Sequence, residues 1–293
     1  MIPPSVAEVR VSEDAPASFA LAPARGEAGQ TVFASPHSGA GCPKDMRPVA
    51  TLAPASLRSA EDVAVDRLVA SGPAHGAPLI AGLLSRAYVD LNRAPDELDP
   101  LLIEACPAAE ASATAKVGAG FGVIPRRAGD GAELYDRRLS LDEARARLAL
   151  GHAPYHAALS ALMHQTRDRH GTALLVDWHS MPSRAVPTGR SGRGVDVILG
   201  DRHGAACRGA VTRRVRSLFE AEGWRVGLNT PYAGGYSTQI WGQPDSGFQA
   251  IQVELNRALY LDEQTLEASA EYGRFLKALE RVIARLAAEA WPR

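Results

Sequence analysis

Short apolar runs, bounded by glycine, proline and polar residues, alternate along this chain with longer stretches of helical periodicity. Runs of about four to eight apolar residues are typical of buried strands, whereas apolar positions three and four apart are typical of helices. The runs predict strands at 31–34, 88–91, 173–182, 195–200, 224–226 and 249–256. The helical patterns cover 141–169 (interrupted at Pro154), 206–221 and 264–290. This alternation predicts a single α/β domain, with a mixed, mostly parallel sheet flanked by helices.

The run from Ala173 to Pro182 carries the most informative polar residues. It opens with four apolar residues, and Asp177 and His179 follow two positions apart. Side chains alternate along a strand, so these two point to the same side, at the carboxyl end where open α/β sheets bind their ligands. His37 lies just past the 31–34 strand in the same way. One such histidine is usually a packed core residue, but two at matching strand ends favour a site.

Three further polar groups allow more than one interpretation. Glu61 and Asp62 precede a predicted helix start, where acidic side chains commonly complement the positive end of the helix dipole. Glu254 lies on the polar face of the last predicted strand, which is either a solvent side or the floor of a site. Asn92 and Arg93 end the 88–91 strand, and a guanidinium there either clamps a carboxylate or lies on the surface.

Composition excludes several classes of protein. The 293 residues carry a formal net charge of −1, which argues against a nucleic-acid binder that neutralises phosphates. The three cysteines form no CxxC pair, so a reducing compartment, the cytoplasm, is expected. Neither a signal peptide nor a bilayer-spanning run of about 20 apolar residues is apparent. We expect one domain over residues 1–293, in which 1–29 form an edge segment or a loose arm.

Two histidines at strand ends, an acid at a helix start and a glutamate on a polar strand face suggest a zinc hydrolase. Catalytic zinc takes three nitrogen or oxygen ligands and leaves one position for water, whose pKa it lowers to about 7. The chain has no HExxH motif, so its ligands would converge from distant segments. A serine hydrolase using Ser38 or Ser180 is an alternative, although neither serine lies in a GxSxG motif. A metal-free binding protein of the same fold is another.

A series of short motifs sharpens this hypothesis. In order they are Ser35–Gly39, Ser85-Arg86, Asp90–Arg93, Pro154–His156, Asp177–Met181, Leu199–Asp201, Asn229–Tyr232 with Gly234-Gly235, Gln252–Arg257, and Leu259-Tyr260. With these motifs the chain resembles the N-formylglutamate amidohydrolase (N-formylglutamate deformylase) family, which is distantly similar to zinc carboxypeptidases and aspartoacylase. The resemblance covers nearly the whole length and implies a zinc-carboxypeptidase-like fold.

The resemblance implies a metal site for one Zn²⁺ per chain. Its ligands would be His37, Asp62 and His179. Zinc carboxypeptidases carry the acid ligand three residues after the first histidine, where this chain has Ala40, so the acid would come from the later helix start. Glu61, next to Asp62, stays an alternative for it. Imidazole and carboxylate ligands also suit other divalent transition metals.

The resemblance also implies catalytic and substrate-binding residues. Glu254 would be the general base, and Arg86 would polarise the scissile carbonyl. The expected substrate-binding residues are Asn92, Arg93, Tyr232, Gly234 and Gly235. From its strand position, Asp177 is a candidate to orient the His179 imidazole.

The implied reaction converts N-formyl-L-glutamate to formate and L-glutamate, as in the last step of one histidine-degradation route. The expected partner is therefore a small N-acyl amino acid, not a nucleic acid or a membrane, and the protein would be a monomer or a homodimer. A hydrolase of another N-acyl amino acid or a short peptide is the nearest alternative. No cation for the glutamate side chain is singled out among Arg184, Arg190, Arg193 and Arg202.

Overall fold

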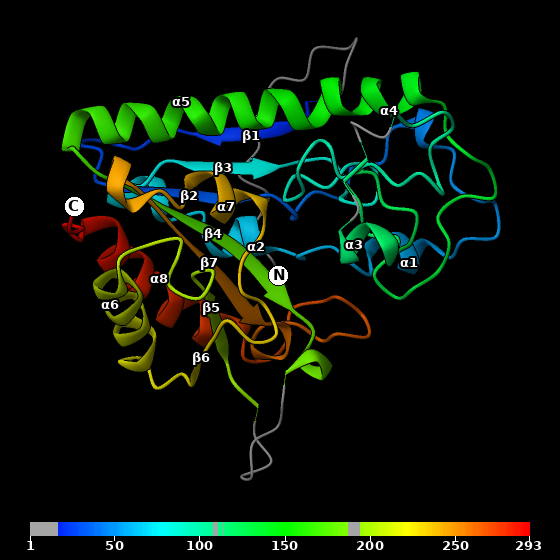
Figure 1. Cartoon of the computed structure of the whole chain (residues 1–293). Coiled ribbons are helices and arrows are strands. Elements are labelled where there is room, and N and C mark those ends of the chain that lie inside the picture. Colours follow the sequence, from blue (N-terminus) through cyan, green and yellow to red (C-terminus); the bar gives the residue numbers. More distant parts are fainter. Residues whose placement is uncertain (1–16, 108–110, 113, 187–193) are drawn as a thin grey trace.

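A seven-stranded sheet forms the centre of the molecule (Figure 1). The structure is a computed structural model, and it describes residues 17–107, 111–112, 114–186 and 194–293. The strands are β1 (Phe19–Ala22), β2 (Thr31–Ser35), β3 (Leu79–Gly82), β4 (Ala173–Met181), β5 (Val197–Gly200), β6 (Val226–Leu228) and β7 (Phe248–Asn256). Their order across the sheet is β1-β3-β2-β4-β7-β5-β6.

The sheet is mixed and mostly parallel, as the sequence predicts. Only the β1/β3 and β5/β7 pairs are antiparallel, and every other adjacent pair is parallel. Strand β4 lies between β2 and β7 and is buried along its whole length. Strands covered on both faces are typical of parallel α/β sheets, which explains the apolar start of β4.

Helices cover both faces of the sheet. They are α1 (Pro54–Arg58), α2 (Val65–Leu68), α3 (Ala115–Gly118), α4 (Leu141–Arg147), α5 (Ala153–His170), α6 (Gly209–Glu220), α7 (Tyr236–Trp241) and α8 (Tyr272–Ala288). Figure 1 shows α6 and α8 on one side of the sheet and the long helix α5 on the other. None of the described helices combines the length and the apolar character that crossing a bilayer requires.

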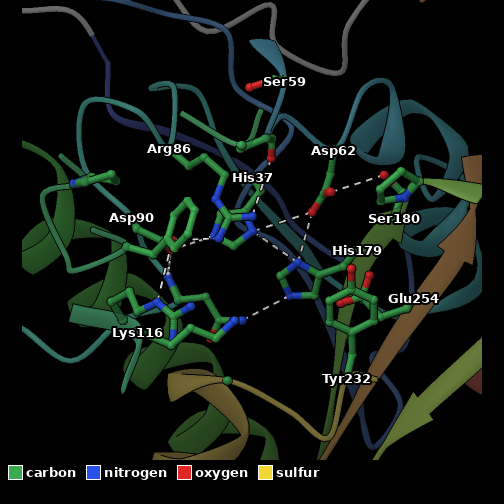
Figure 2. A pocket seen from close by; sticks show the side chains of 18 of the residues that line it. His37, Ser59, Asp62, Arg86, Asp90, Lys116, His179, Ser180, Tyr232 and Glu254 are labelled. Atoms are coloured by element: carbon green, nitrogen blue, oxygen red, sulfur yellow. Dashed lines mark hydrogen bonds and ion pairs between the residues drawn. The ribbon is translucent and has the colours of Figure 1, made fainter. Parts of the chain in front are cut away.

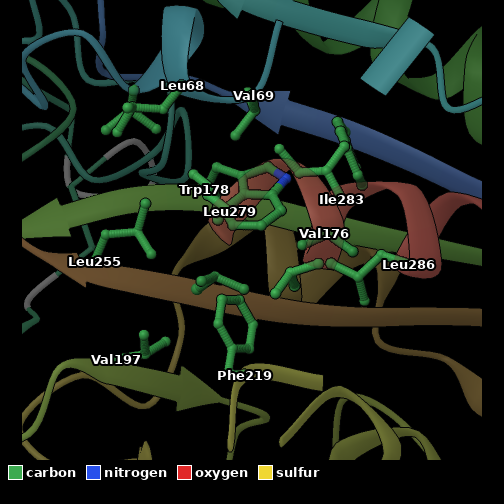
Figure 3. Close-up of a cluster of buried hydrophobic side chains, with 14 of the residues drawn as sticks. Leu68, Val69, Val176, Trp178, Val197, Phe219, Leu255, Leu279, Ile283 and Leu286 are labelled. Carbon is green, nitrogen blue, oxygen red and sulfur yellow. The ribbon is translucent and has the colours of Figure 1, made fainter. Parts of the chain in front are cut away.

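The side chains of β4 divide between two cores. Val176 and Trp178 point toward α8 and α6, where they pack with Phe219 and Ile283 (Figure 3). On the opposite face, Leu175 belongs to a second core under α5. Asp177 and His179 lie on this second face, closer to the carboxyl end of β4 than Leu175. Alternation along the strand therefore places both polar side chains at the carboxyl edge of the sheet.

Of the two alternatives for residues 1–29, an edge segment fits residues 19–22, which form β1 and pair with β3 at the edge of the sheet; residues 1–16 lie outside the described part. The expectation of a strand at 88–91 is wrong. The apolar residues of this segment are buried, but Ser85 accepts hydrogen bonds from Ala87, Tyr88 and Val89, and the chain turns instead of extending.

Helix α8 and strand β6 begin downstream of their predicted starts. Helix α8 begins at Tyr272, not at residue 264, because Asp262 accepts backbone hydrogen bonds from Gln264 and Thr265 and holds that stretch in a turn. Strand β6 begins at Val226, two residues after the predicted start. Pro154 falls at the beginning of α5, directly after a π-helical turn that connects it to α4.

Candidate metal centre and active site

Three strands bring the predicted chemistry to one edge of the sheet. His37 follows β2 by two residues, His179 lies near the carboxyl end of β4, and Glu254 lies near the carboxyl end of β7. His179 and Glu254 are direct register partners across the β4/β7 pair. The parallel arrangement of β2, β4 and β7 therefore brings together residues that are far apart in the sequence, such as His37 and His179, which are separated by 142 positions.

His37, Asp62 and His179 form a compact buried triangle (Figure 2). The two Nδ1 atoms lie 3.2 Å apart, and Asp62 Oδ2 lies 3.0 Å from Nδ1 of His179 and 3.5 Å from Nδ1 of His37. The ligand atoms all lie within 4.8 Å of one another. Two imidazole nitrogens and a carboxylate oxygen that converge in this way can hold a metal ion.

A carboxylate stands behind each histidine. His37 Nε2 lies 2.7 Å from Asp90 Oδ1, and His179 Nε2 lies 3.0 Å from Asp177 Oδ2. Both acids are buried. A carboxylate on the outer ring nitrogen orients the imidazole and leaves the Nδ1 lone pair directed at the site. This geometry fits the predicted role of Asp177 and adds Asp90, to which the sequence analysis gave no role.

Asp62 is fixed from its other side. Its Oδ1 accepts hydrogen bonds from Ser180 Oγ at 3.1 Å and Arg257 Nη2 at 3.3 Å, so Oδ2 is left facing the two histidines. Glu61 turns away and pairs with Arg58 at 2.7 Å. Asp62 is therefore the acid that completes the triangle, although it lies in a turn before the short helix α2 and not at the start of a long helix.

The acid and the histidines of the triangle stabilise one another's charged forms. Burial opposes ionisation of Asp62, but its contacts with His179 and His37 hold the pKa of that carboxyl well below its usual value. Burial likewise opposes protonation of His179, yet Asp177 and Asp62 raise the pKa of that imidazole well above its usual value. A metal ion that binds Nδ1 would displace this proton, so protons and metal compete for the site.

Glu254 is a buried carboxylate beside the triangle. Burial raises the pKa of Glu254 to about 7, and the negative charge of Asp62 adds to the rise. Gln252 Nε2 donates a hydrogen bond to Glu254 Oε1 at 2.7 Å. A carboxyl whose pKa lies near neutrality can both accept and return a proton, which is the property of a general base.

These residues line a cavity of about 400 Å³. We call His37, Asp62, His179 and Glu254 the metal end of this cavity. We call Arg86, Arg93 and Lys116 the cation end. In Figure 2, Arg86 and Lys116 lie across the cavity from Glu254. Asp90 connects the two ends, because its Oδ2 accepts a 2.7 Å hydrogen bond from Arg86 Nη2 while its Oδ1 contacts His37.

The predicted substrate-binding residues line the same cavity. Asn92, however, is already engaged. Its Nδ2 donates to Asp177 and its Oδ1 accepts from the backbone of Ser237. A Cβ at Gly235 would collide with this amide, which explains the glycine there. Tyr232 and Gly234 form part of the cavity wall, and the contact of all these residues with substrate stays a prediction.

Two histidines behind the cation end have no role in the sequence analysis. His152 Nε2 donates to the Arg93 carbonyl at 2.9 Å, and His156 Nε2 donates to the Leu91 carbonyl at 2.8 Å. The two rings lie 4.3 Å apart. The signal for this arrangement is Pro154 between them, because the π-helical turn before it directs both rings toward the 90–93 turn.

The serine alternatives do not fit the geometry. Ser180 Oγ contacts Asp62 and Arg257, and Ser38 Oγ contacts Ser35 and the backbone of Asp66, so neither hydroxyl has the histidine partner that a nucleophilic serine requires. Among the arginines considered for the substrate side chain, Arg184 lines the cavity. Arg190 and Arg193 lie outside the described residues.

The fold and the site define a single-domain α/β protein with a candidate metal centre at the carboxyl edge of its sheet. Residues 29–261 match the family model for N-formylglutamate amidohydrolase, so this chain belongs to that family. It is 34% identical over 192 residues to the N-formylglutamate deformylase of Pseudomonas aeruginosa and 32% identical over 191 residues to that of Pseudomonas putida. Each alignment covers 64% of this chain and 66% of the relative, just under two thirds.

Solved structures agree with this assignment. The N-formylglutamate amidohydrolase of Ralstonia eutropha superposes with a TM-score of 0.86 at 32% identity, over 92% of this chain and 97% of that one. A gene product of Agrobacterium tumefaciens superposes with a TM-score of 0.62 over 92% and 94% of the two chains. At 19% identity, the second structure supports the fold alone.

Proposed function

We propose that this protein is a metal-dependent amidohydrolase that cleaves N-formyl-L-glutamate to formate and L-glutamate. The observation that carries the proposal is the buried carboxyl of Glu254, with a pKa of about 7, one strand away from His179 in the His37–Asp62–His179 triangle. The names of the relatives supply the substrate, and the geometry of the cavity supplies the means to attack an amide carbonyl.

The residues of the triangle fit a divalent metal, and zinc fits best. They offer two nitrogen donors and one oxygen donor, the ligand number that catalytic zinc sites use. Asp90 and Asp177 fix the two imidazoles from behind. A divalent metal bound here would lower the pKa of a water and polarise the substrate carbonyl.

The chain itself supplies the proton transfers and part of the charge stabilisation. Glu254 would accept the proton of the attacking water and pass it to the leaving amine nitrogen, for which its pKa of about 7 is suited. Arg86, fixed by its ion pair with Asp90, would stabilise the negative charge that develops on the carbonyl oxygen.

We place this activity in the cytoplasm and in histidine degradation. The support for a reducing compartment is that the three cysteines form no CxxC pair and that Cys42 and Cys207 are free thiols. The support for the pathway is the substrate alone.

The decisive experiment combines metal analysis with formate release. We expect one zinc per chain, formate release from N-formyl-L-glutamate, and loss of that release after chelation. Glu254→Gln should lower turnover by more than about 1,000-fold with metal content unchanged, because the amide keeps the shape of the side chain but cannot accept the proton. Glu61→Gln is the matched control, since Glu61 pairs with Arg58 outside the cavity.

Each result has a defined meaning. Wild-type turnover in the Glu254→Gln variant would remove Glu254 from the reaction. Bound metal without formate release would keep the hydrolase and redirect the search to other N-acyl amino acids. A protein that neither binds metal nor turns over substrate after zinc is added would be a binding protein of the same fold.

A further inference from the structure

The cation end of the cavity carries more positive charge than its surroundings balance. Arg86, Arg93 and Lys116 contribute three positive charges. Asp90 pairs with Arg86 at 2.7 Å, and Asp62 and Glu254 at the metal end also act on Arg86. Arg93 lies 3.9 Å from Asp90, and Asp90 is the carboxylate that acts on Lys116. Among the described residues, Arg93 and Lys116 therefore have no close ion pair, which matches a ligand with two carboxylates and no ammonium group.

Lys116 is the cation with the fewest commitments. It lies on α3, lines the cavity, and makes no ion pair with any residue in the described ranges. Partial burial lowers the pKa of its ammonium, and the positive charges of Arg93 and Arg86 lower it further. The positive charges of three neighbouring cations repel one another, and an anion that binds between them stabilises the charged form of all three.

Arg93 also has unused hydrogen-bonding capacity. Its Nε is buried and finds no hydrogen-bond partner in the described part of the chain. A buried guanidinium nitrogen without a hydrogen-bond partner is costly, and an ordered water, an ion or a ligand atom that accepts a hydrogen bond from it would remove that cost. Arg93 and Lys116 thus present two separate, unsatisfied donor groups to the same space.

We propose that Lys116 binds the side-chain carboxylate of an N-acylated dicarboxylic amino acid while Arg93 binds its α-carboxylate. Lys116 is then the residue that selects an acidic side chain over a neutral one. This inference rests on the proposed function, since the acyl group must reach the metal end while both carboxylates lie at the cation end.

Other cations of the cavity fit this role less well. Arg127 is paired with Glu133 at 2.8 Å, and Arg257 is held by Asp62 and Ser180. Arg184 follows β4 near the opposite rim, where the carboxylate that feels its charge is Asp130 and not Asp90. Arg184 is therefore the matched control for Lys116, because it is an exposed cation of the same cavity.

The test measures binding separately from turnover. In the zinc-loaded Glu254→Gln protein, calorimetry would compare the dissociation constants of N-formyl-L-glutamate and N-formyl-L-glutamine, which differ only in the side-chain charge. We expect a preference of about 10- to 100-fold for the glutamate compound, the size of one charge-assisted hydrogen bond. Lys116→Met should abolish this preference, Lys116→Arg should restore most of it, and Arg184→Met should leave it intact.

The outcomes separate this inference from the proposed function. A preference that survives Lys116→Met, that disappears with Arg184→Met instead, or that is absent from the parent protein overturns the role of Lys116. Formate release by the protein with Glu254 intact is measured in parallel. If release fails while the Lys116-dependent preference stands, the proposed reaction is wrong and the dicarboxylate site remains. Unchanged zinc content and melting temperature in Lys116→Met would show that the loss is local.

Discussion

The two ends of the cavity are built in different ways. At the metal end, the histidines and Glu254 belong to β2, β4 and β7 or follow them directly, and the side chains of His37, Asp62 and His179 are at most 4% exposed. At the cation end, Arg86 and Arg93 lie on turns and are 25% and 19% exposed, and Lys116 lies on a helix of four residues. The two histidines and Glu254 are thus positioned by the sheet, whereas Asp62 and the residues of the cation end lie on the connections between its strands.

This difference indicates which positions can change independently. Residues fixed by parallel strands cannot move without disturbing the central sheet, whereas turn residues can be replaced with little effect on the core. Asp90 is the exception, because it contacts His37 at the metal end and Arg86 at the cation end. Substitutions at each end would show whether a change at one end leaves the function of the other end unchanged.

The largest effect on zinc binding is expected from removing the acid of the triangle. Asp62→Asn should weaken zinc binding by more than about 100-fold, because it removes the one charged ligand of the triangle. This loss is larger than the loss typical of substituting a residue that only orients a ligand. Zinc content in buffers of fixed free zinc would measure the effect, and Glu61→Gln serves as the control. Full metal loading of Asp62→Asn together with loss in Glu61→Gln would mean that Glu61 is the ligand.

A comparison of Asp90→Asn with Asp177→Asn would show how the ends are connected. Each should weaken zinc binding by about 10- to 100-fold, because each removes the carboxylate behind one histidine. At saturating zinc, Asp90→Asn should also lower kcat more than Asp177→Asn does, since Arg86 loses the ion pair that fixes it for its proposed role at the carbonyl oxygen. Equal kcat values for the two variants at saturating zinc would show that Asp90 does not couple the ends.

The contrast between the ends also explains what the sequence could predict. The period-2 pattern placed Asp177 and His179 on one side of β4 and Glu254 on the polar face of β7, because alternation is a local rule that burial enforces. The resemblance to the family favoured Asp62 and left Glu61 as an alternative, since no local rule distinguishes the two. The structure does so by directing Glu61 to Arg58.

Residues that act through turns were harder to predict. The apolar content of 88–91 suggested a strand, whereas Ser85 and tertiary contacts such as the hydrogen bond from Asp90 N to Val123 O make it a turn. Asp90 consequently had no expected role. Lys116 lies in a long irregular segment without periodicity, so only the folded chain shows that it shares a cavity with Arg93.

The smallest effect concerns the histidines behind the cation end. Burial, with the neighbouring His152, lowers the pKa of His156 from 6.5 to about 4. The unfolded chain therefore binds this proton first as the pH falls, so the contribution of neutral His156 to stability is complete above about pH 6.5 and is lost toward pH 4, by about 3 kcal/mol at most. His156→Gln keeps a donor for the Leu91 carbonyl but cannot titrate. Urea unfolding of the metal-free proteins between pH 4.5 and 7 should show that the free energy of unfolding declines less steeply with falling pH in the variant. The two proteins share every other titrating group. Parallel curves would therefore mean that protonation of His156 does not loosen the turn that carries Arg93.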